Sequence, residues 1–438
     1  MDTINKEILR LSVPTIVSNI TVPLLGICDT AISGHLGSEL YLSSIAVGSV
    51  MLNVVFWIFG FLRGGTTGLT ANALGSGVKP EISKVLYRSL LLAFIAGVLI
   101  IILQKPIFKG LWWITGGSEE IEKYVMDYFK FRVLGGPALL GTMAVSGWFV
   151  GMQTTFYPML IAILMNIFNI GVSCLLVFGM DYGFNGIAIG TMISNWLGFG
   201  VALICMIWFG KGQLLKCTLN NLLRGEWWRY FAVNGNLFLR SLCIICVTMG
   251  VTAVGARLGN LTLAINAIIM QFFLFFSFFM DGFAFSGEAM VGLRAGEKNY
   301  IMLGKSVKRL LQWTLGTGVT FSLVYLFAGD LICCLLTDNE IVRKGVNELL
   351  PWIVLIPIAS CWAFIYDGFY IGITDTYKMM ISALLGGIVF YGVVSLNFWE
   401  ASVAIAGNQV IWTAFLGYLT VRGLYLAIMW RRMDFQVS

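Results

Sequence analysis

Long runs of hydrophobic residues, separated by short polar connections, cover most of the chain. An apolar run of about 20 residues is the length that a helix needs to cross a bilayer core about 30 Å thick. Runs of this kind predict transmembrane helices at residues 8–34, 43–74, 86–104, 124–151, 156–179, 184–209, 229–256, 262–294, 307–329, 346–372, 378–398 and 402–430. The pattern therefore predicts an all-α, multi-pass membrane protein with twelve transmembrane helices.

The connections between these runs fall into two alternating sets, and basic residues gather in one of them. Lysines and arginines of this set group at residues 79–88, 211–229, 298–309 and 431–432, whereas in the other set, taken together, basic residues are matched or outnumbered by acidic ones. Because basic loops stay on the cytoplasmic side, this alternation predicts that both termini are cytoplasmic. We expect the chain in the plasma (inner) membrane.

Small-residue motifs recur at a spacing near 221 residues. The motif Gly147-Trp-Phe-Val-Gly151 matches Gly368-Phe-Tyr-Ile-Gly372, and Pro137 matches Pro357. Each match is weak alone because glycine is abundant, but their common order indicates an internal duplication. Six helices per repeat is an even number, so the two halves share one orientation in the membrane. Parallel repeats of this kind are typical of transporters.

The stretch at residues 211–229 is polar and basic and separates the two repeats. We interpret it as a cytoplasmic linker, with a boundary near residue 222. The predicted domains are an amino-terminal six-helix lobe, residues 1–222, and a carboxyl-terminal six-helix lobe, residues 223–438.

Composition agrees with a membrane protein and argues against several other classes. Of the 438 residues, 58% are hydrophobic and 11% are charged, against roughly a quarter charged in soluble domains. The net charge of +6 comes from scattered residues rather than from an aromatic-interleaved patch, so no nucleic-acid partner is expected. Nine cysteines, most of them in apolar runs, and a single histidine indicate neither a disulfide framework nor a metal site. Because phosphate-binding loops and nucleophile elbows are also absent, we expect no enzyme and no cofactor.

Asp29 is the only ionisable residue of the first apolar run after Arg10. A charge at membrane depth is costly and usually faces protein or a water-filled cavity, so Asp29 is a candidate functional group. Pro14 and Pro23 interrupt the same run and remove backbone donors, which predicts a bend. Alternatively, Asp29 ends the helix at the far membrane surface, because it lies roughly 28 Å beyond Arg10 along a helix.

Further polar side chains lie within the predicted helices of the amino-terminal half. Asn166, Asn169 and Ser173 share one face of the fifth helix, and Thr191 lies in the sixth. Two interpretations stay open for these residues. They are either hydrogen-bonding contacts between helices or parts of a polar site.

In the carboxyl-terminal half, Asp281 and Glu288 share a face of the eighth helix, and Asp367 lies in the tenth. Arg63, Glu288 and Arg422 lie toward predicted cytoplasmic ends, where snorkelling or pairing at the interface is the favoured interpretation. For Asp281 and Asp367, a functional role and structural pairing both stay open.

The sequence resembles the DinF branch of the multidrug and toxic compound extrusion (MATE) family. The resemblance rests on residues 29–42, which begin Asp-Thr-Ala-Ile-Ser-Gly-His-Leu-Gly, and on residues 280–289 and 367–372. It implies two lobes around a central cleft, alternating access, and export of organic cations or other amphipathic compounds in exchange for protons or sodium ions. It also implies that Asp29 binds the coupling cation and that the first helix bends at Pro14. Asn169 and Thr191 match polar positions of the family's amino-terminal lobe.

One departure from the family pattern concerns Ser173. Many relatives carry an aspartate one turn after the equivalent of Asn169, where this chain has Ser173. With one carboxylate fewer, the site suits sodium less well, so we expect a proton as the coupling ion, with sodium as the alternative. The expected partners are a small organic substrate and membrane lipid, and we expect a monomer.

Two other functions are compatible with twelve transmembrane helices. A flippase of a lipid-linked precursor needs a strongly cationic cavity for pyrophosphate, whereas the charges at membrane depth here are mainly Asp29, Asp281 and Asp367. A structural or sensory membrane protein without transport has no need of buried carboxylates. The sequence therefore favours a cation-coupled exporter.

Overall fold

The computed structural model describes residues 3–36, 39–115, 118–211, 214, 227–398 and 404–433, and within these ranges it contains helices and no strands. By contacts between residues, the chain divides into two compact units, Val13–Tyr230, and Met1–Ser12 together with Phe231–Ser438. We call them the amino-terminal and the carboxyl-terminal unit. The boundary predicted near residue 222 lies outside the described residues.

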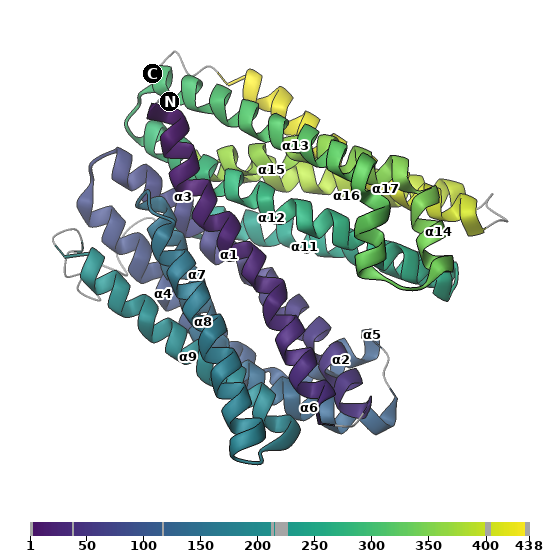
Figure 1. Ribbon diagram of the computed structural model, residues 1–438. Coiled ribbons are helices and arrows are strands. Elements are labelled where there is room, and N and C mark those ends of the chain that lie inside the picture. Colours follow the sequence, from purple (N-terminus) through teal and green to yellow (C-terminus); the bar gives the residue numbers. More distant parts are fainter. Residues whose placement is uncertain are drawn as a thin grey trace. The chain divides into compact units, whose positions relative to one another are not determined.

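The amino-terminal unit takes in α1 from Val13 onward and the helices up to α9 (Figure 1). Their bounds are α1 (Thr3–Gly34), α2 (Glu39–Trp57), α3 (Phe61–Gly75), α4 (Lys79–Ile102), α5 (Gln104–Thr115), α6 (Glu119–Leu134), α7 (Gly136–Gly151), α8 (Phe156–Cys174) and α9 (Gly183–Phe209). A 3-10 turn, η1 (Ile58–Gly60), joins α2 to α3, and a π-helical segment, η2 (Leu175–Gly179), extends α8.

The carboxyl-terminal unit contains the remaining described helices. They are α11 (Trp227–Arg257), α12 (Asn260–Gly296), α13 (Tyr300–Leu336), α14 (Glu340–Glu348), α15 (Leu350–Gly372), α16 (Thr376–Phe398) and α17 (Ala404–Arg431). The first turns of α1 belong to this unit as well, because Trp313 Nε1 of α13 donates to Asn5 Oδ1 at 3.1 Å. Arg294 of α12 likewise pairs with Glu7 at 3.1 Å.

Each of the twelve predicted helices corresponds to one described helix or to a joined pair, which confirms the fold prediction. Ten helices in the described residues are long and apolar enough to cross a membrane, and the pair α6–α7 makes eleven. With α1 the total is twelve. The pair α6–α7 corresponds to the single helix predicted at residues 124–151, and the two helices meet at an angle of 46°. Gly135 lies between the two helices and Pro137 stands in the first turn of α7, where it breaks the backbone ladder.

Two short helices, α5 and α14, were not predicted. Four of the nine residues of α14 are charged, so it lacks the apolar run that identifies a spanning segment. Its N-cap residue is Asn339, whose side-chain oxygen accepts hydrogen bonds from the Ile341 and Val342 amides. This cap stabilises a helix too short and too polar to cross a membrane.

The structure confirms the internal repeat through two close helix crossings. A Cβ atom on Gly147 of α7 would lie 2.3 Å from the carbonyl oxygen of Arg63 in α3. A Cβ atom on Gly368 of α15 would lie 2.3 Å from the carbonyl oxygen of Ala284 in α12. Both residues of the second crossing come 221 positions after those of the first. Only glycine permits this approach of two backbones, which is how small residues hold membrane helices together.

The turns after these helices repeat as well. Gln153 follows α7 and Thr374 follows α15, with φ of 64° and 61°. Gly77 follows α3 and Lys298 follows α12, with φ of 73° and 56°. These left-handed residues end their helices in Schellman turns, in which an amide bonds back to a carbonyl five residues earlier. The duplication thus preserves helix ends as well as helix crossings.

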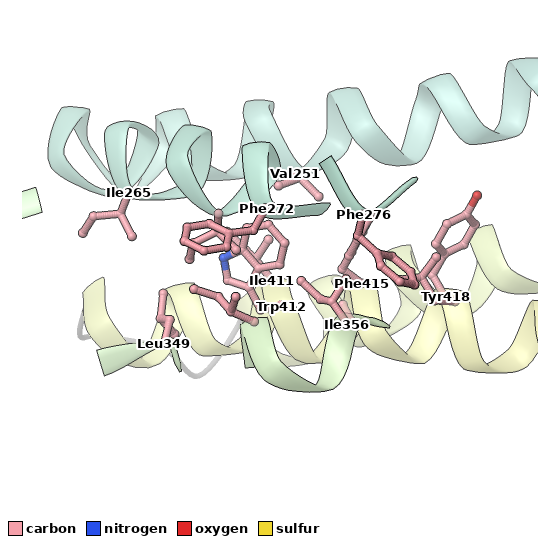
Figure 2. Packing of buried hydrophobic residues seen from close by; sticks show 14 of the residues in the cluster. Val251, Ile265, Phe272, Phe276, Leu349, Ile356, Ile411, Trp412, Phe415 and Tyr418 are labelled. Atoms are coloured by element: carbon pink, nitrogen blue, oxygen red, sulfur yellow. The ribbon is translucent and has the colours of Figure 1, made fainter. Parts of the chain in front are cut away.

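Aromatic side chains fill the core of the carboxyl-terminal unit (Figure 2). Phe272 and Phe276 of α12 pack in one cluster with Trp412 and Phe415 of α17. The rings of Trp412 and Phe415 meet edge to face at 5.6 Å, and Trp412 Nε1 donates to Asn266 Oδ1 at 2.8 Å. A buried indole that packs and also satisfies its N–H fixes the position of α17.

We predict that Gly368→Ala destabilises the protein by about 1–3 kcal/mol, because the added methyl group meets a backbone oxygen that has no rotamer to move to. Thermal unfolding of the detergent-solubilised protein, followed by tryptophan fluorescence, measures this. The matched control is Gly316→Ala on α13, where nothing lies within 4 Å of the new methyl group. The control should be neutral or stabilising by up to about 1 kcal/mol. Equal melting temperatures for the two variants would contradict the close crossing.

Candidate functional site

Asp29 lies on α1, and only 5% of its surface is exposed. Its Oδ2 is 3.8 Å from Nη1 of Arg132 on α6, which is an ion pair but too long for a hydrogen bond. Its Oδ1 is buried and has no hydrogen-bond partner in the described part of the chain. The carboxylate is therefore held next to one positive charge, without the hydrogen bonds that normally stabilise a buried anion.

Arg132 is held by an aromatic residue one turn earlier on α6. Its Nη1 donates to the Tyr128 hydroxyl at 3.3 Å, and its guanidinium lies 5.5 Å from the centre of that ring. The Tyr128 hydroxyl is 3.4 Å from Ser49 Oγ of α2. A Cβ on Gly48 would lie 2.7 Å from the tyrosine ring, so the glycine makes room for it. These contacts fix the guanidinium that faces Asp29.

Sequence reasoning missed Arg132 and Tyr128. Both lie within the transmembrane helix predicted at residues 124–151, near a helix start that carries Glu119, Glu120 and Glu122, and neither was singled out. The available signal was the four-residue spacing of Tyr128 and Arg132, which places both on one helical face.

A second polar group lies in the seam between α8 and α9. Asn169 Nδ2 donates to Thr191 Oγ1 at 2.7 Å, and the Thr191 hydroxyl donates to the Ile187 carbonyl at 3.1 Å. Asn169 Oδ1 and Ser173 Oγ are both buried without a partner in the described chain. A Cβ on Gly190 would lie 2.3 Å from Ser173 Oγ, so the serine packs directly against α9. Asn169 Oδ1 and Ser173 Oγ can therefore each still accept a hydrogen bond.

Asn166 connects α8 to α1. Its Nδ2 donates to the Thr21 carbonyl at 3.2 Å, and Thr21 lies eight residues before Asp29, about 12 Å along a helix. No hydrogen bond among the described residues joins Asp29 directly to Asn169, and the oxygens of both remain unpartnered. The structure thus brings together Asn169, Ser173 and Thr191, and it ties their helix to that of Asp29 through Asn166.

Pro14 and Pro23 both lie inside α1, which is helical from Thr3 to Gly34. The division between the two units falls between Ser12 and Val13, beside Pro14. The bend at these prolines stays a prediction.

In the carboxyl-terminal unit, Asp367 of α15 receives two guanidinium groups. Arg422 Nη2 of α17 donates to its Oδ2 at 2.6 Å, and Arg240 of α11 donates to the same oxygen. Arg422 also donates through Nη1 to the Tyr418 hydroxyl at 2.9 Å. Snorkelling and pairing were the two alternatives for Arg422, and the structure favours pairing, because only 5% of this residue is exposed and its charge is paired with Asp367.

Asp281 and Glu288 do not join the Asp367 cluster, whose described bonds come from Arg240 and Arg422 alone. Both residues lie on α12, where Glu288 is buried and Asp281 is half-buried. Burial of Glu288 disfavours snorkelling, which was one of the two alternatives for this residue. The described residues include no group of three or more histidine, cysteine, aspartate or glutamate side chains that could hold a metal ion.

The MatE family model matches residues 14–175 and 237–395 of the chain. DNA damage-inducible protein F of Escherichia coli (strain K12) is 34% identical over 433 residues, which are 98% of this chain and 92% of that protein. The probable multidrug resistance protein NorM of Thermotoga maritima is 31% identical over 223 residues, 49% of this chain and 47% of that protein.

Solved structures share the fold at low sequence identity. A MATE structure in a bent conformation superposes with a TM-score of 0.87 at 16% identity, over 98% of this chain and 96% of that one. A MOP superfamily transporter from Pyrococcus furiosus gives a TM-score of 0.86 at 17% identity, over the same shares of the two chains.

We predict that Thr191→Val lowers the free energy of unfolding by about 1–3 kcal/mol, because it leaves the buried Asn169 amide without its acceptor. Thermal unfolding of the solubilised protein measures the loss. Thr320→Val on α13 is the matched control, since that hydroxyl is exposed and bonds only the Gly316 carbonyl one turn earlier. An effect no larger than the control's would show that the Asn169 contact contributes little.

Proposed function

We propose that this chain, which belongs to the MatE family, exports organic cations or other amphipathic compounds in exchange for protons. The family membership makes it a multi-pass membrane protein and a secondary transporter of the multidrug efflux type, and not an enzyme. The observation that carries the finer proposal is Asp29, a buried carboxylate with one unpartnered oxygen beside one guanidinium.

A proton on Asp29 changes the forces within the amino-terminal unit. The ionised carboxylate attracts Arg132, and this attraction is stronger at a buried site than in water. The protonated carboxyl group loses that attraction, and it also avoids the cost of a buried charge. Coupling follows if the charged and the neutral form favour different arrangements of the transporter, because only a difference in affinity between states can shift their balance.

The surroundings of Asp29 support a proton rather than sodium. A hard metal cation prefers several fixed oxygen ligands, preferably with more than one negative charge. Among the described polar groups of this site, Asp29 supplies one carboxylate, and the unpartnered oxygens of the seam, on Asn169 and Ser173, are neutral. Arg132 repels any metal ion that approaches Asp29. A proton avoids this conflict, since it needs one titrating group and no coordination shell.

Several of the relatives that match carry multidrug resistance or detoxification names, and none of the relatives named here supports a lipid-linked precursor flippase. We further propose that the chain works as a monomer in the inner membrane with both termini in the cytoplasm.

Asp29→Asn should fold normally and lose gradient-driven transport. The amide has nearly the shape of the carboxylate, and the change removes no hydrogen bond that Asp29 makes. In proteoliposomes, the wild-type protein should move ethidium in response to an imposed pH gradient and ignore a sodium gradient. The control Asp338→Asn makes the same change at an exposed site and should transport normally. Either sodium-driven ethidium movement in the wild-type protein or undiminished activity of Asp29→Asn would refute the proposal.

Arg132→Gln should make transport sensitive to sodium, because it removes the positive charge that keeps metal cations from Asp29. The measurement compares pH-driven ethidium efflux in sodium chloride and in choline chloride at equal ionic strength. Arg132→Lys retains the charge and should be as indifferent to sodium as the wild type. If Arg132→Gln shows the same rate in both salts, the guanidinium does not decide the choice of ion.

A further inference from the structure

A buried cluster with an excess of positive charge lies among the helices of the carboxyl-terminal unit. Arg240 of α11 and Arg422 of α17 both donate to one oxygen of Asp367 on α15. The only other partner described for these guanidinium groups is the neutral hydroxyl of Tyr418. Two positive charges therefore meet one negative charge. An unbalanced charge among membrane helices is costly and is usually kept for a function.

The two arginines differ in the donors that they have left. Arg422 uses both terminal nitrogens, one on Asp367 and one on Tyr418, and its side chain is 7% exposed. Arg240 uses only Nη2, and its side chain is 19% exposed. Nη1 of Arg240 thus retains its hydrogen-bond donors on the accessible side of the cluster. A guanidinium can bind one carboxylate through one edge and a second anion through the other.

The cluster is built on rigid packing. Tyr418 belongs to the same aromatic core as Trp412 and Phe415 (Figure 2). On the facing helix α16, a Cβ on Gly386 would lie 3.0 Å from Arg422 Cγ and 2.8 Å from the Tyr418 ring. The glycine therefore makes room for the arginine stem. Three polar atoms of the cluster are buried without a hydrogen-bond partner in the described chain, namely Asp367 Oδ1 and the Nε atoms of both arginines. The existing ion pairs therefore do not use every donor and acceptor of this site.

Exposed apolar side chains lie next to Arg240 in the sequence of α11. Phe238, Leu239 and Leu242 flank Arg240 on α11 and are 36%, 44% and 38% exposed. A ligand that reaches Arg240 within the membrane-spanning helices thus meets a positive charge beside apolar surface. This combination suits an amphipathic molecule with one anionic group.

We propose that Arg240, oriented by Asp367 and backed by Arg422, binds the carboxylate, sulfonate or phosphate group of an amphipathic compound. The site widens the substrate class of the proposed exporter to anionic and zwitterionic amphiphiles, and to that extent it rests on the proposed function. Asp367 acts in this site as the fixed counter-charge that holds the two guanidinium groups in place.

The experiment measures binding of dansyl-undecanoic acid and of its methyl ester to the full-length protein in phosphatidylcholine nanodiscs. The two probes differ only in the negative charge. The wild-type protein should bind the acid roughly tenfold to a hundredfold more tightly than the ester, as expected for a charge-assisted hydrogen bond. Arg240→Gln should abolish this preference and leave ester binding unchanged. It leaves Asp367 and Arg422 as a balanced pair, so the variant should fold. Arg257→Gln, an exposed change near the end of the same helix, should behave as the wild type.

Asp367→Asn gives a second readout of opposite sign. The asparagine oxygen can still accept the hydrogen bonds that position Arg240, while the internal negative charge that competes for this guanidinium is lost. The acid should therefore bind several-fold more tightly while the ester is unaffected. A purely structural ion-pair cluster does not produce a gain of affinity for the acid alone. The proposal is overturned if the wild-type protein binds acid and ester equally, or if Arg240→Gln retains the preference.

Addition of phosphatidylglycerol to the nanodiscs identifies the natural source of the anion. If this lipid displaces the acid from the wild-type protein, the site takes lipid headgroups. If it does not, the site selects soluble amphiphiles. Both results support an anion site. Asp29→Asn should still bind the acid normally, so a failure of proton coupling and a failure of the anion site are distinguishable.

Discussion

An ionised side chain inside a membrane-spanning helix needs a partner of opposite charge, and this requirement organises the polar interior of both units. Asp29 has a single guanidinium at 3.8 Å and an oxygen without a partner. Asp367 receives two guanidinium groups, one of them at 2.6 Å. The first arrangement gives the anionic carboxylate little stabilisation. The second arrangement surrounds the carboxylate with charge-assisted hydrogen bonds, which are the strong ones.

Close packing at glycines holds several of these charged side chains in fixed positions. Gly368 lies one residue after Asp367, so the crossing of α15 on α12 also fixes the carboxylate. Gly48 and Gly386 are used in a similar way, since each makes room for a tyrosine that bonds an arginine. In a membrane, apolar surface alone does not drive helices together, and close packing with interhelical hydrogen bonds takes its place.

The sequence predicted the helices and the repeat well, because both follow from long apolar runs and small-residue spacing. It also identified Asp29 and Asp367, since a carboxylate stands out in an apolar run. It did not identify their partners. Arg132 lies within the helix predicted at residues 124–151 and was not singled out, while snorkelling and pairing were both left open for Arg422 near the end of α17. Whether an arginine near a helix end turns inward depends on a carboxylate on another helix, and periodicity within one helix does not contain that information.

The duplication preserved packing but not chemistry. The glycine crossings and the left-handed turns recur 221 residues apart, yet neither carboxylate is repeated. Asp29-Thr-Ala aligns with Val251-Thr-Ala, and the position equivalent to Asp367 is Ser146. One unit presents a loosely paired acid, and the other presents a base in excess. The two units thus share their helix packing but carry different charged groups, which allows each to recognise a different ligand. On the two proposals above, the amino-terminal unit takes the proton and the carboxyl-terminal unit takes the anionic group of the cargo. Because the two sites share no residue, substitutions in one should change ion coupling and substitutions in the other should change cargo selection, each without the other.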